Sequence, residues 1–225
     1  KRKKAKQMTE KENISSLCKR YLFLFTGLVI MSFGVAFSIK GNLGTSPISS
    51  VPYVVNLFTP LTVGNATIIM HCVFILMQIL ILRRKYKLIQ LMQLPVAIVF
   101  GYLTDLSIWV IQGITYSNYF HQWILCIIGI ILVATGVSFE VTANVVTLAG
   151  EGVVLAICKV LPIKFGYMKV AFDVTLVVTA CLLSFIFLKR LEGVREGTIA
   201  AAIMVGLISK QINKYLKKFE YHYLN

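Results

Sequence analysis

Charged residues are scarce in this sequence. Only 14% of the 225 residues are Asp, Glu, Lys or Arg, whereas about 25% is usual for a soluble domain. Hydrophobic residues make up 57% of the chain. This balance excludes a soluble enzyme, a nucleic-acid-binding module or a disordered tail as a description of the whole chain. The length of the chain is better expressed as the number of membrane-spanning helices that it can form, each of which needs about 20 apolar residues.

Residue types with catalytic or metal-binding chemistry are also few. The chain has three histidines, and its five cysteines form no C-x-x-C pair. The signatures H-E-x-x-H and G-x-S-x-G and the phosphate-binding P-loop are missing. We therefore predict that the protein is not an enzyme and that it has neither a metal site nor a cofactor.

The charge that is present is basic and clustered. Residues 1–20 hold eight Lys or Arg against two Glu, residues 83–87 hold four, and residues 210–225 hold four Lys against one Glu. Short basic clusters beside apolar runs are typical of cytoplasmic segments, and no nucleic-acid readout motif accompanies them. We predict a multi-pass protein of the cell inner (cytoplasmic) membrane, with the lipid bilayer as partner and no nucleic acid. The basic leader (1–20) and the basic tail (213–225) are both expected in the cytoplasm.

The apolar runs predict an all-α polytopic membrane protein. Two segments are too short to cross, because prolines close them: one follows Pro47 and ends before Pro60, and the other covers residues 148–160 before Pro162. We interpret both as broken or re-entrant helices. The six expected full crossings cover residues 21–39, 64–82, 88–112, 121–141, 166–188 and 198–212.

An internal repeat emerges when the chain is shifted by 102 residues. We define the first membrane repeat as residues 21–113 and the second as residues 121–212. Each half then has three crossings, an odd number, so the halves are expected to be inverted relative to each other, as in many secondary transporters. The alternative is a parallel repeat with tilted or interfacial short helices. The identical pairs are Gly34/Gly136, Val35/Val137, Phe37/Phe139, Asn42/Asn144, Thr45/Thr147, Val51/Val153, Pro60/Pro162 and Gly64/Gly166.

Several stretches resemble a known family. The segment from Gly34 to Thr45, the triplet Thr62-Val63-Gly64, the segment from Gly101 to Asp105 and the segment from Gly193 to Thr198 are similar to the YczE/YyaS/YitT family of bacterial integral membrane proteins. The resemblance implies a multi-pass bacterial inner-membrane protein with a suspected transport role. In the second half the motif is degenerate, since residues 149–152 read Ala-Gly-Glu-Gly where the first half has Pro-Ile-Ser-Ser.

Polar residues at the start of the first short helix suggest a solute site. Ser or Thr can cap free N–H groups, and Pro is tolerated at the first helical position. A half-helix N-terminus also carries about half a positive charge, which suits an anionic group or a polar carbonyl. The alternative is that the cap satisfies only the helix's own amides. The predicted substrate-binding residues are Asn42, Gly44, Thr45, Ser46, Ser49, Asn144, Thr147 and Glu151.

Ionisable residues within the apolar runs form a second predicted group. An ionised carboxylate in the bilayer is costly, so it requires a partner, a water cavity or a shifted pKa. Lys169 and Asp173 are one helical turn apart, and the 102-residue shift matches Asp173 with His71. The alternative is that Lys169 and Asp173 only neutralise each other and that His71 is a hydrogen-bonded core residue. The predicted proton- or ion-coupling residues are His71, Glu140, Lys169 and Asp173.

These patterns favour a transporter or channel for a small polar solute, anionic solutes included, with a central site between two half-helices. One alternative is a substrate-binding membrane subunit of a larger transport complex. Another is a membrane accessory or regulatory protein without a transport role. Whether the chain forms a homo-oligomer or pairs with a partner membrane subunit stays open at this point.

Overall fold

The computed structural model describes residues 2–219, with side chains from residue 16 to residue 216. In this part of the chain every regular element is a helix, which confirms the all-α fold. The side chains of residues 1–15 and 217–225, which belong to the predicted basic leader and tail, lie outside the described residues. The main helices are α1 (Arg2–Gly41), α2 (Pro47–Phe58), α3 (Val63–Leu82), α4 (Gln93–Val110), α5 (Tyr119–Ala143), α6 (Ala149–Val160), α7 (Phe165–Leu183) and α8 (Glu196–Phe219).

Within the described part of the chain, five helical segments are long and apolar enough to cross a membrane: Ser16–Gly41, Val63–Lys85, Leu88–Val110, Tyr119–Ala143 and Phe165–Leu188. The short helices η1 (Arg83–Lys85) and η2 (Leu88–Met92) and the π-helical turn η3 (Ser184–Leu188) adjoin these segments. Large apolar side chains stay exposed on them; Leu80, for example, is 72% exposed. So much exposed apolar surface suits lipid better than water.

The sixth expected crossing, α8, does not belong to this group. Polar residues enter the helix from Lys210 onward, and Lys214 follows one turn later, so the uninterrupted apolar stretch is too short. The helix nevertheless lies along α5. The Gly197 N–H donates to the carbonyl of Leu43 at 2.8 Å, and the Ser209 hydroxyl donates to the carbonyl of Ala134 at 3.0 Å.

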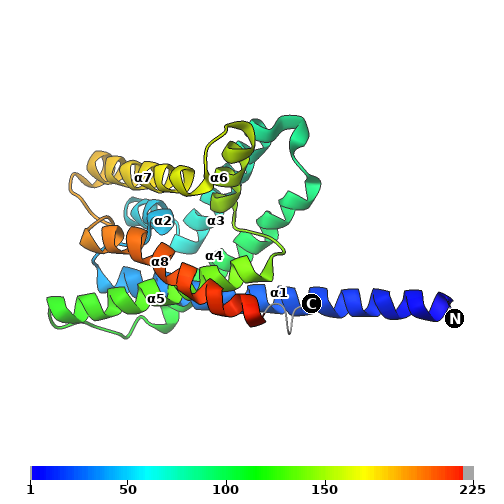
Figure 1. Ribbon diagram of the computed structural model, residues 1–225. Helices are drawn as coiled ribbons and strands as arrows, with labels where there is room; N and C mark the ends of the chain where they lie inside the picture. Colours follow the sequence, from blue (N-terminus) through cyan, green and yellow to red (C-terminus); the bar gives the residue numbers. More distant parts are fainter. Residues whose placement is uncertain (1, 220–225) are drawn as a thin grey trace.

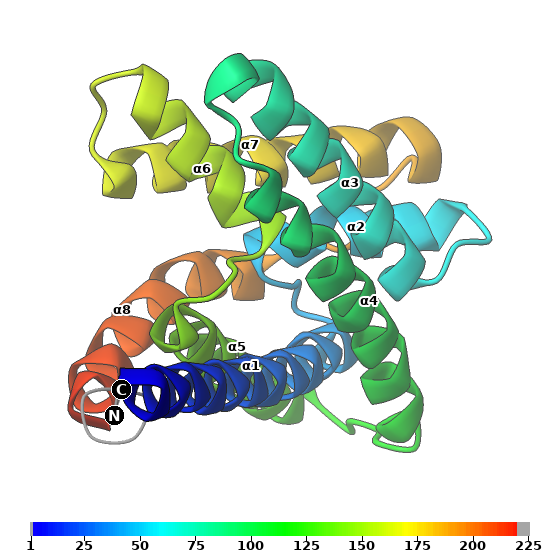
Figure 2. The ribbon, with the colours of Figure 1, turned by 90° about the vertical axis from the view of Figure 1, so that its right-hand side faces the viewer.

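The longest helix pair, α1 and α5, forms the base of the molecule (Figures 1 and 2). The two helices are antiparallel, with glycines where they cross. A Cβ on Gly34 would lie 2.9 Å from the carbonyl oxygen of Gly129, and a Cβ on Gly27 would lie 3.0 Å from that of Gly136. Small residues allow close backbone approach, which drives helix association in membranes through van der Waals contact.

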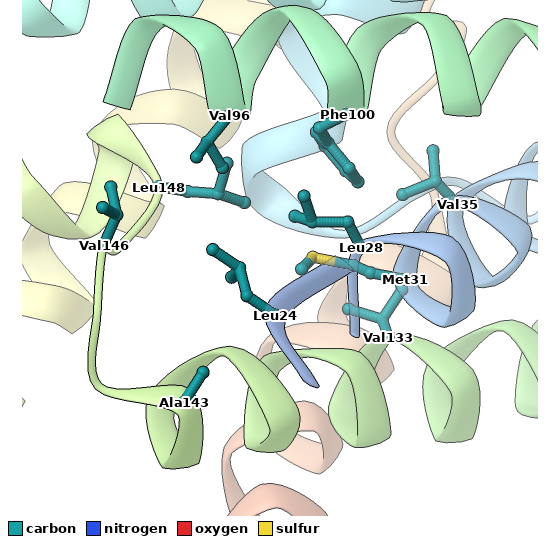
Figure 3. Packing of buried hydrophobic residues seen from close by; sticks show 10 residues of the cluster. All are labelled: Leu24, Leu28, Met31, Val35, Val96, Phe100, Val133, Ala143, Val146 and Leu148. Carbon is teal, nitrogen blue, oxygen red and sulfur yellow. The ribbon is translucent and has the colours of Figure 1, made fainter. Parts of the chain in front are cut away.

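The remaining helices pack on this pair and on each other. Helix α4 packs on α1 and on α3, α8 packs on α5, α2 packs on α7, and α3 packs on α6. Figure 3 shows how the apolar core joins these elements: Leu24 and Leu28 of α1 face Val96 and Phe100 of α4, with Leu148 beside them. The core therefore holds the start of α6 against the first half of the chain.

The two expected short helices are present. Helices α2 and α6 each have 12 residues and are about 18 Å long, which is too short to cross the hydrocarbon core. They begin 102 positions apart, as do α3 and α7. Asn42 and Asn144, which precede the short helices, have left-handed φ angles of 53° and 50°.

Candidate functional site

A cavity of about 330 Å3 lies where α2 and α6 begin. Six helices besides these two contribute to its wall. Most of the lining is apolar, and part of it is shared with the core in Figure 3. The volume falls at the lower end of the range for small-molecule sites, roughly 300–1,000 Å3. The main apolar lining residues are Met31, Val35, Phe100, Val133, Val137 and Val205.

The N-termini of the two short helices meet at this cavity. A Cβ on Gly150 of α6 would collide with the side chain of Ile48 of α2. At the start of α2, the Ser46 hydroxyl donates to the Ser49 hydroxyl at 3.1 Å, and both residues line the cavity. The N-cap residue of α6 is Leu148, which has no side-chain acceptor to offer.

Two glutamates compensate for this missing cap. Glu140 of α5 is only 1% exposed, and its Oε1 accepts a hydrogen bond from the Leu148 N–H at 2.6 Å. Glu140 thus supplies the hydrogen-bond acceptor that the start of α6 needs. Glu151 lies in the first turn of α6 and also lines the cavity. Among the described residues, its carboxylate has neither a hydrogen bond nor an ion pair.

Helix α7 contributes an ion pair to the same cavity. The Nζ of Lys169 lies 2.6 Å from Oδ1 of Asp173, and the two side chains are 29% and 19% exposed. Both residues line the cavity. The distance corresponds to a charge-assisted hydrogen bond between residues one turn apart. The pair is therefore neutral as a unit.

His71 of α3 completes the polar part of the wall. Its side chain is 1% exposed, and its Nδ1 atom is buried without a hydrogen-bond partner. The ring stands edge-on to Phe74 and Phe100, with centroid distances of 6.0 and 6.4 Å. A buried polar atom without a partner is uncommon, so this nitrogen is available to a bound molecule or a water.

The predicted site residues fall into two groups. The cavity is lined by Ser46, Ser49, His71, Glu140, Glu151, Lys169 and Asp173. The other predicted residues lie elsewhere. Thr45 is buried and its hydroxyl donates to the carbonyl of Ser46 at 3.4 Å, Thr147 is half-buried, and Asn144 is exposed.

Asn42 and Gly44 lie at the junction of α1 and α8. Asn42 lines a smaller polar pocket with Arg195, whose guanidinium donates to the Asn42 carbonyl at 2.9 Å. Gly44 has φ of +95° and packs against Thr198, so a side chain there would collide. In the same region the pKa of Glu196 is lowered, chiefly by its own backbone N–H; burial opposes this shift, and hydrogen bonds and charge from Tyr119 and Arg195 add to it. These contacts join α1 to α8 and do not reach the central cavity.

The sequence analysis missed one buried polar pair. Gln78 of α3 is fully buried, and its amide nitrogen donates to Oε1 of Gln93 at 2.8 Å and to the carbonyl of Ala149 at 3.1 Å. The contact fixes the first residue of α6 against α3 and α4. A glutamine within an apolar run is the signal that could have revealed it.

Comparisons with known proteins agree with this description of a helical membrane protein. Residues 18–214 match the family model described as "Family of unknown function (DUF6198)". An "Uncharacterized protein YyaS" of Bacillus subtilis (strain 168) is 23% identical over 207 residues, which cover 92% of this chain and 96% of that protein. An "Uncharacterized membrane protein YczE" of the same strain is 27% identical over 195 residues, or 85% of this chain and 84% of that protein.

No solved structure matches the chain. The resemblance to YczE and YyaS expected from the sequence is confirmed by these two relatives. The family model covers the cavity and the five long apolar segments, except for the first two residues of Ser16–Gly41. The chain is therefore a membrane protein that belongs to the family of unknown function DUF6198.

Proposed function

We propose that this protein is a membrane transporter that carries a small polar solute through the cavity between α2 and α6, and that its two halves are inverted repeats. No catalytic step is part of the proposal. The observation that carries it is the composition of the cavity wall, which draws on equivalent positions of both halves. The pairs 102 positions apart that line the cavity are Met31/Val133, Val35/Val137, Ser46/Leu148, Ser49/Glu151, Thr67/Lys169, His71/Asp173 and Phe100/Ala202.

The crossing of α1 and α5 supports the inverted arrangement. The offset of 102 carries Gly27 to Gly129 and Gly34 to Gly136. The contact of Gly27 with Gly136 is therefore the image of the contact of Gly34 with Gly129. A two-fold axis through an antiparallel helix pair relates such contacts, as expected for inverted repeats with a central site.

The charge clusters support an orientation for the proposed transporter. A cytoplasmic N-terminus puts the end of α1 on the opposite side, where Lys40 donates to the carbonyl of Gln112 beyond α4 at 2.7 Å. Arg20, at the start of α1, donates to the carbonyl of Ala143 at the end of α5 at 3.1 Å. If α2 and α6 re-enter and leave on one side, the basic segment 83–87 lies in the cytoplasm, as the positive-inside bias favours.

One difference between the halves supports an alternating-access mechanism. Helix α3 packs along α4, and a Cβ on Gly64 would collide with the carbonyl of Gly101. Its counterpart α7 packs on α2 and α6 but not along α8 over the described residues, and a Cβ on Gly166 or Gly206 would have no neighbour within 4 Å. We propose that the halves exchange these arrangements, so that α7 closes on α8 when α3 parts from α4.

Uptake into proteoliposomes tests this function. We would reconstitute the full chain and measure flux of a panel of small cationic, neutral and anionic solutes. Val170 of α7 lines the cavity and has room around it, since it is 64% exposed, whereas Val174 is 56% exposed and lies outside the lining. Val170→Trp should reduce any saturable flux, and Val174→Trp should leave it unchanged.

Two outcomes would count against transport. One is the absence of flux above protein-free vesicles for the whole panel. The other is equal flux in the two tryptophan variants. Tight solute binding without flux, with co-purifying chains, would instead favour a binding subunit of a larger complex, and neither binding nor flux would favour an accessory role.

A further inference from the structure

The charged groups of the central cavity do not balance. Among the described residues, Lys169 is the only lysine or arginine in the lining, and Asp173 already pairs with it at 2.6 Å. Glu140 and Glu151 remain, and both belong to the start of α6. The helix end that could attract an anion is thus already occupied by the protein's own carboxylates.

The two glutamates have different surroundings. Glu140 is enclosed and bonded to the Leu148 N–H, so it acts as the cap of α6. Glu151 faces the cavity without a hydrogen bond or ion pair in the described part of the chain. A carboxylate in a largely apolar cavity requires a counter-charge, and Lys169, the cation whose charge acts on Glu151, is itself bonded to Asp173.

A second observation points to a ligand at the same place. His71 lines the cavity, is 1% exposed, and keeps a buried Nδ1 atom without a partner. Phe100, whose ring lies edge-on to His71, provides an aromatic surface on the cavity wall. Aromatic faces attract cations, and the valines and Met31 around them suit an apolar body.

We propose that the solute is a small organic ammonium ion with an apolar body, and that Glu151 is its main counter-charge. This inference rests on the central cavity being the solute site of the proposed function. The proposed solute is therefore a cation, whereas the N-termini of α2 and α6 by themselves would favour an anion. The wall favours an organic cation over a hydrated inorganic one, because most of the lining is apolar and would bury the apolar body of the ion.

Binding of three probes of similar shape tests the charge preference. We would titrate the purified full chain in detergent with benzylamine, which is cationic at pH 7, benzyl alcohol and benzoate, and use calorimetry to compare affinities. Benzylamine should bind roughly tenfold more tightly than benzyl alcohol, and benzoate should bind most weakly. Glu151→Gln should remove this preference, and Glu151→Asp should retain most of it.

Glu192→Gln is the matched control, because Glu192 pairs with Arg190 outside the central cavity. Size-exclusion profiles and retained benzyl alcohol binding would establish that the Glu151 variants are folded. Equal binding of the three probes, tighter binding of benzoate, no binding of benzylamine, or equal behaviour of Glu151→Gln and Glu192→Gln would overturn the inference. Saturable flux of anions alone would overturn the preference for an organic cation but leave the proposed transport function standing. Benzylamine binding without flux of any solute would support the preference for a cation but count against transport.

Discussion

Asp105 near the end of α4 is bonded to Gly64 in the first turn of α3: its Oδ1 accepts the Gly64 N–H at 2.7 Å. Its other oxygen accepts the Thr62 hydroxyl at 2.6 Å, and that hydroxyl oxygen in turn accepts the Asn65 N–H at 3.1 Å. One carboxylate thus caps α3 and ties it to α4. The contact joins the two helices that part in the proposed mechanism when α7 closes on α8.

Removal of this carboxylate should therefore loosen the first half. Asp105→Ala leaves the Gly64 N–H and the Thr62 hydroxyl without their partner, and should lower the free energy of unfolding by about 1–3 kcal/mol. Thermal unfolding in detergent would measure the change. Asp105→Asn keeps one acceptor and should lie between the wild type and Asp105→Ala, so an unchanged melting temperature in both variants would contradict this role.

The glycines Gly64 and Gly166 give a second prediction, because they occupy equivalent positions in different surroundings. Gly64→Ala places a methyl group against the backbone of Gly101 and should cost about 1–3 kcal/mol. Gly166→Ala meets no atom within 4 Å and should change stability by less than about 1 kcal/mol. Parallel melting curves of the two variants measure this difference.

The same pair tests alternating access. If α7 must close on α8 during the transport cycle, Gly166→Ala should reduce flux although the protein is as stable as the wild type. Uptake by proteoliposomes with equal amounts of protein measures this. Wild-type flux in Gly166→Ala would mean that α7 and α8 do not need to approach each other.

Much of the fold could be predicted from the sequence because its signals are local. Prolines limit the two short helices, and their observed bounds, Pro47–Phe58 and Ala149–Val160, fall within the expected segments. Uncharged runs likewise predict the five long apolar segments. The sixth expected crossing depended on a shorter run, and the lysines from Lys210 onward lower its apolar character.

The site was harder to predict, because residue type does not reveal why a residue is needed. Asn42 and Asn144 were expected to bind solute, yet both have left-handed backbone angles at the end of a long helix. Asn tolerates this conformation better than most residues. The backbone turn therefore explains why Asn occurs at both positions, and no bound solute is needed to explain it. The apolar wall of the cavity comes from helices distant in sequence, and only packing brings Met31, Phe100 and Val205 together.

The topology proposed for the short helices gives a third prediction. Pro60 follows α2, Lys85 follows α3, and both are exposed. If α2 re-enters and leaves on one side and the N-terminus is cytoplasmic, Pro60→Cys in a cysteine-free chain should react with a membrane-impermeant maleimide from the extracytoplasmic side, and Lys85→Cys should react from the cytoplasmic side. Labelling of oriented vesicles before and after permeabilisation measures this. The reverse pattern, with Pro60→Cys reacting from the cytoplasmic side and Lys85→Cys from the extracytoplasmic side, would mean that α2 crosses.

The ion pair of Lys169 and Asp173 gives the last prediction, because substitutions can remove either charge alone or both charges together. Lys169→Met leaves the Asp173 carboxylate unpaired at the cavity wall, and Asp173→Asn leaves the ammonium group unpaired. An uncompensated charge in a low-dielectric wall is costly, whereas removal of both charges is not. Each single variant should therefore lower the unfolding temperature more than the double variant does, which calorimetry of all four proteins would measure. Transport by the double variant then separates the two roles: retained flux means that the pair only neutralises itself, and flux lost in a stable double variant means that its charges act on the solute or on a coupled proton.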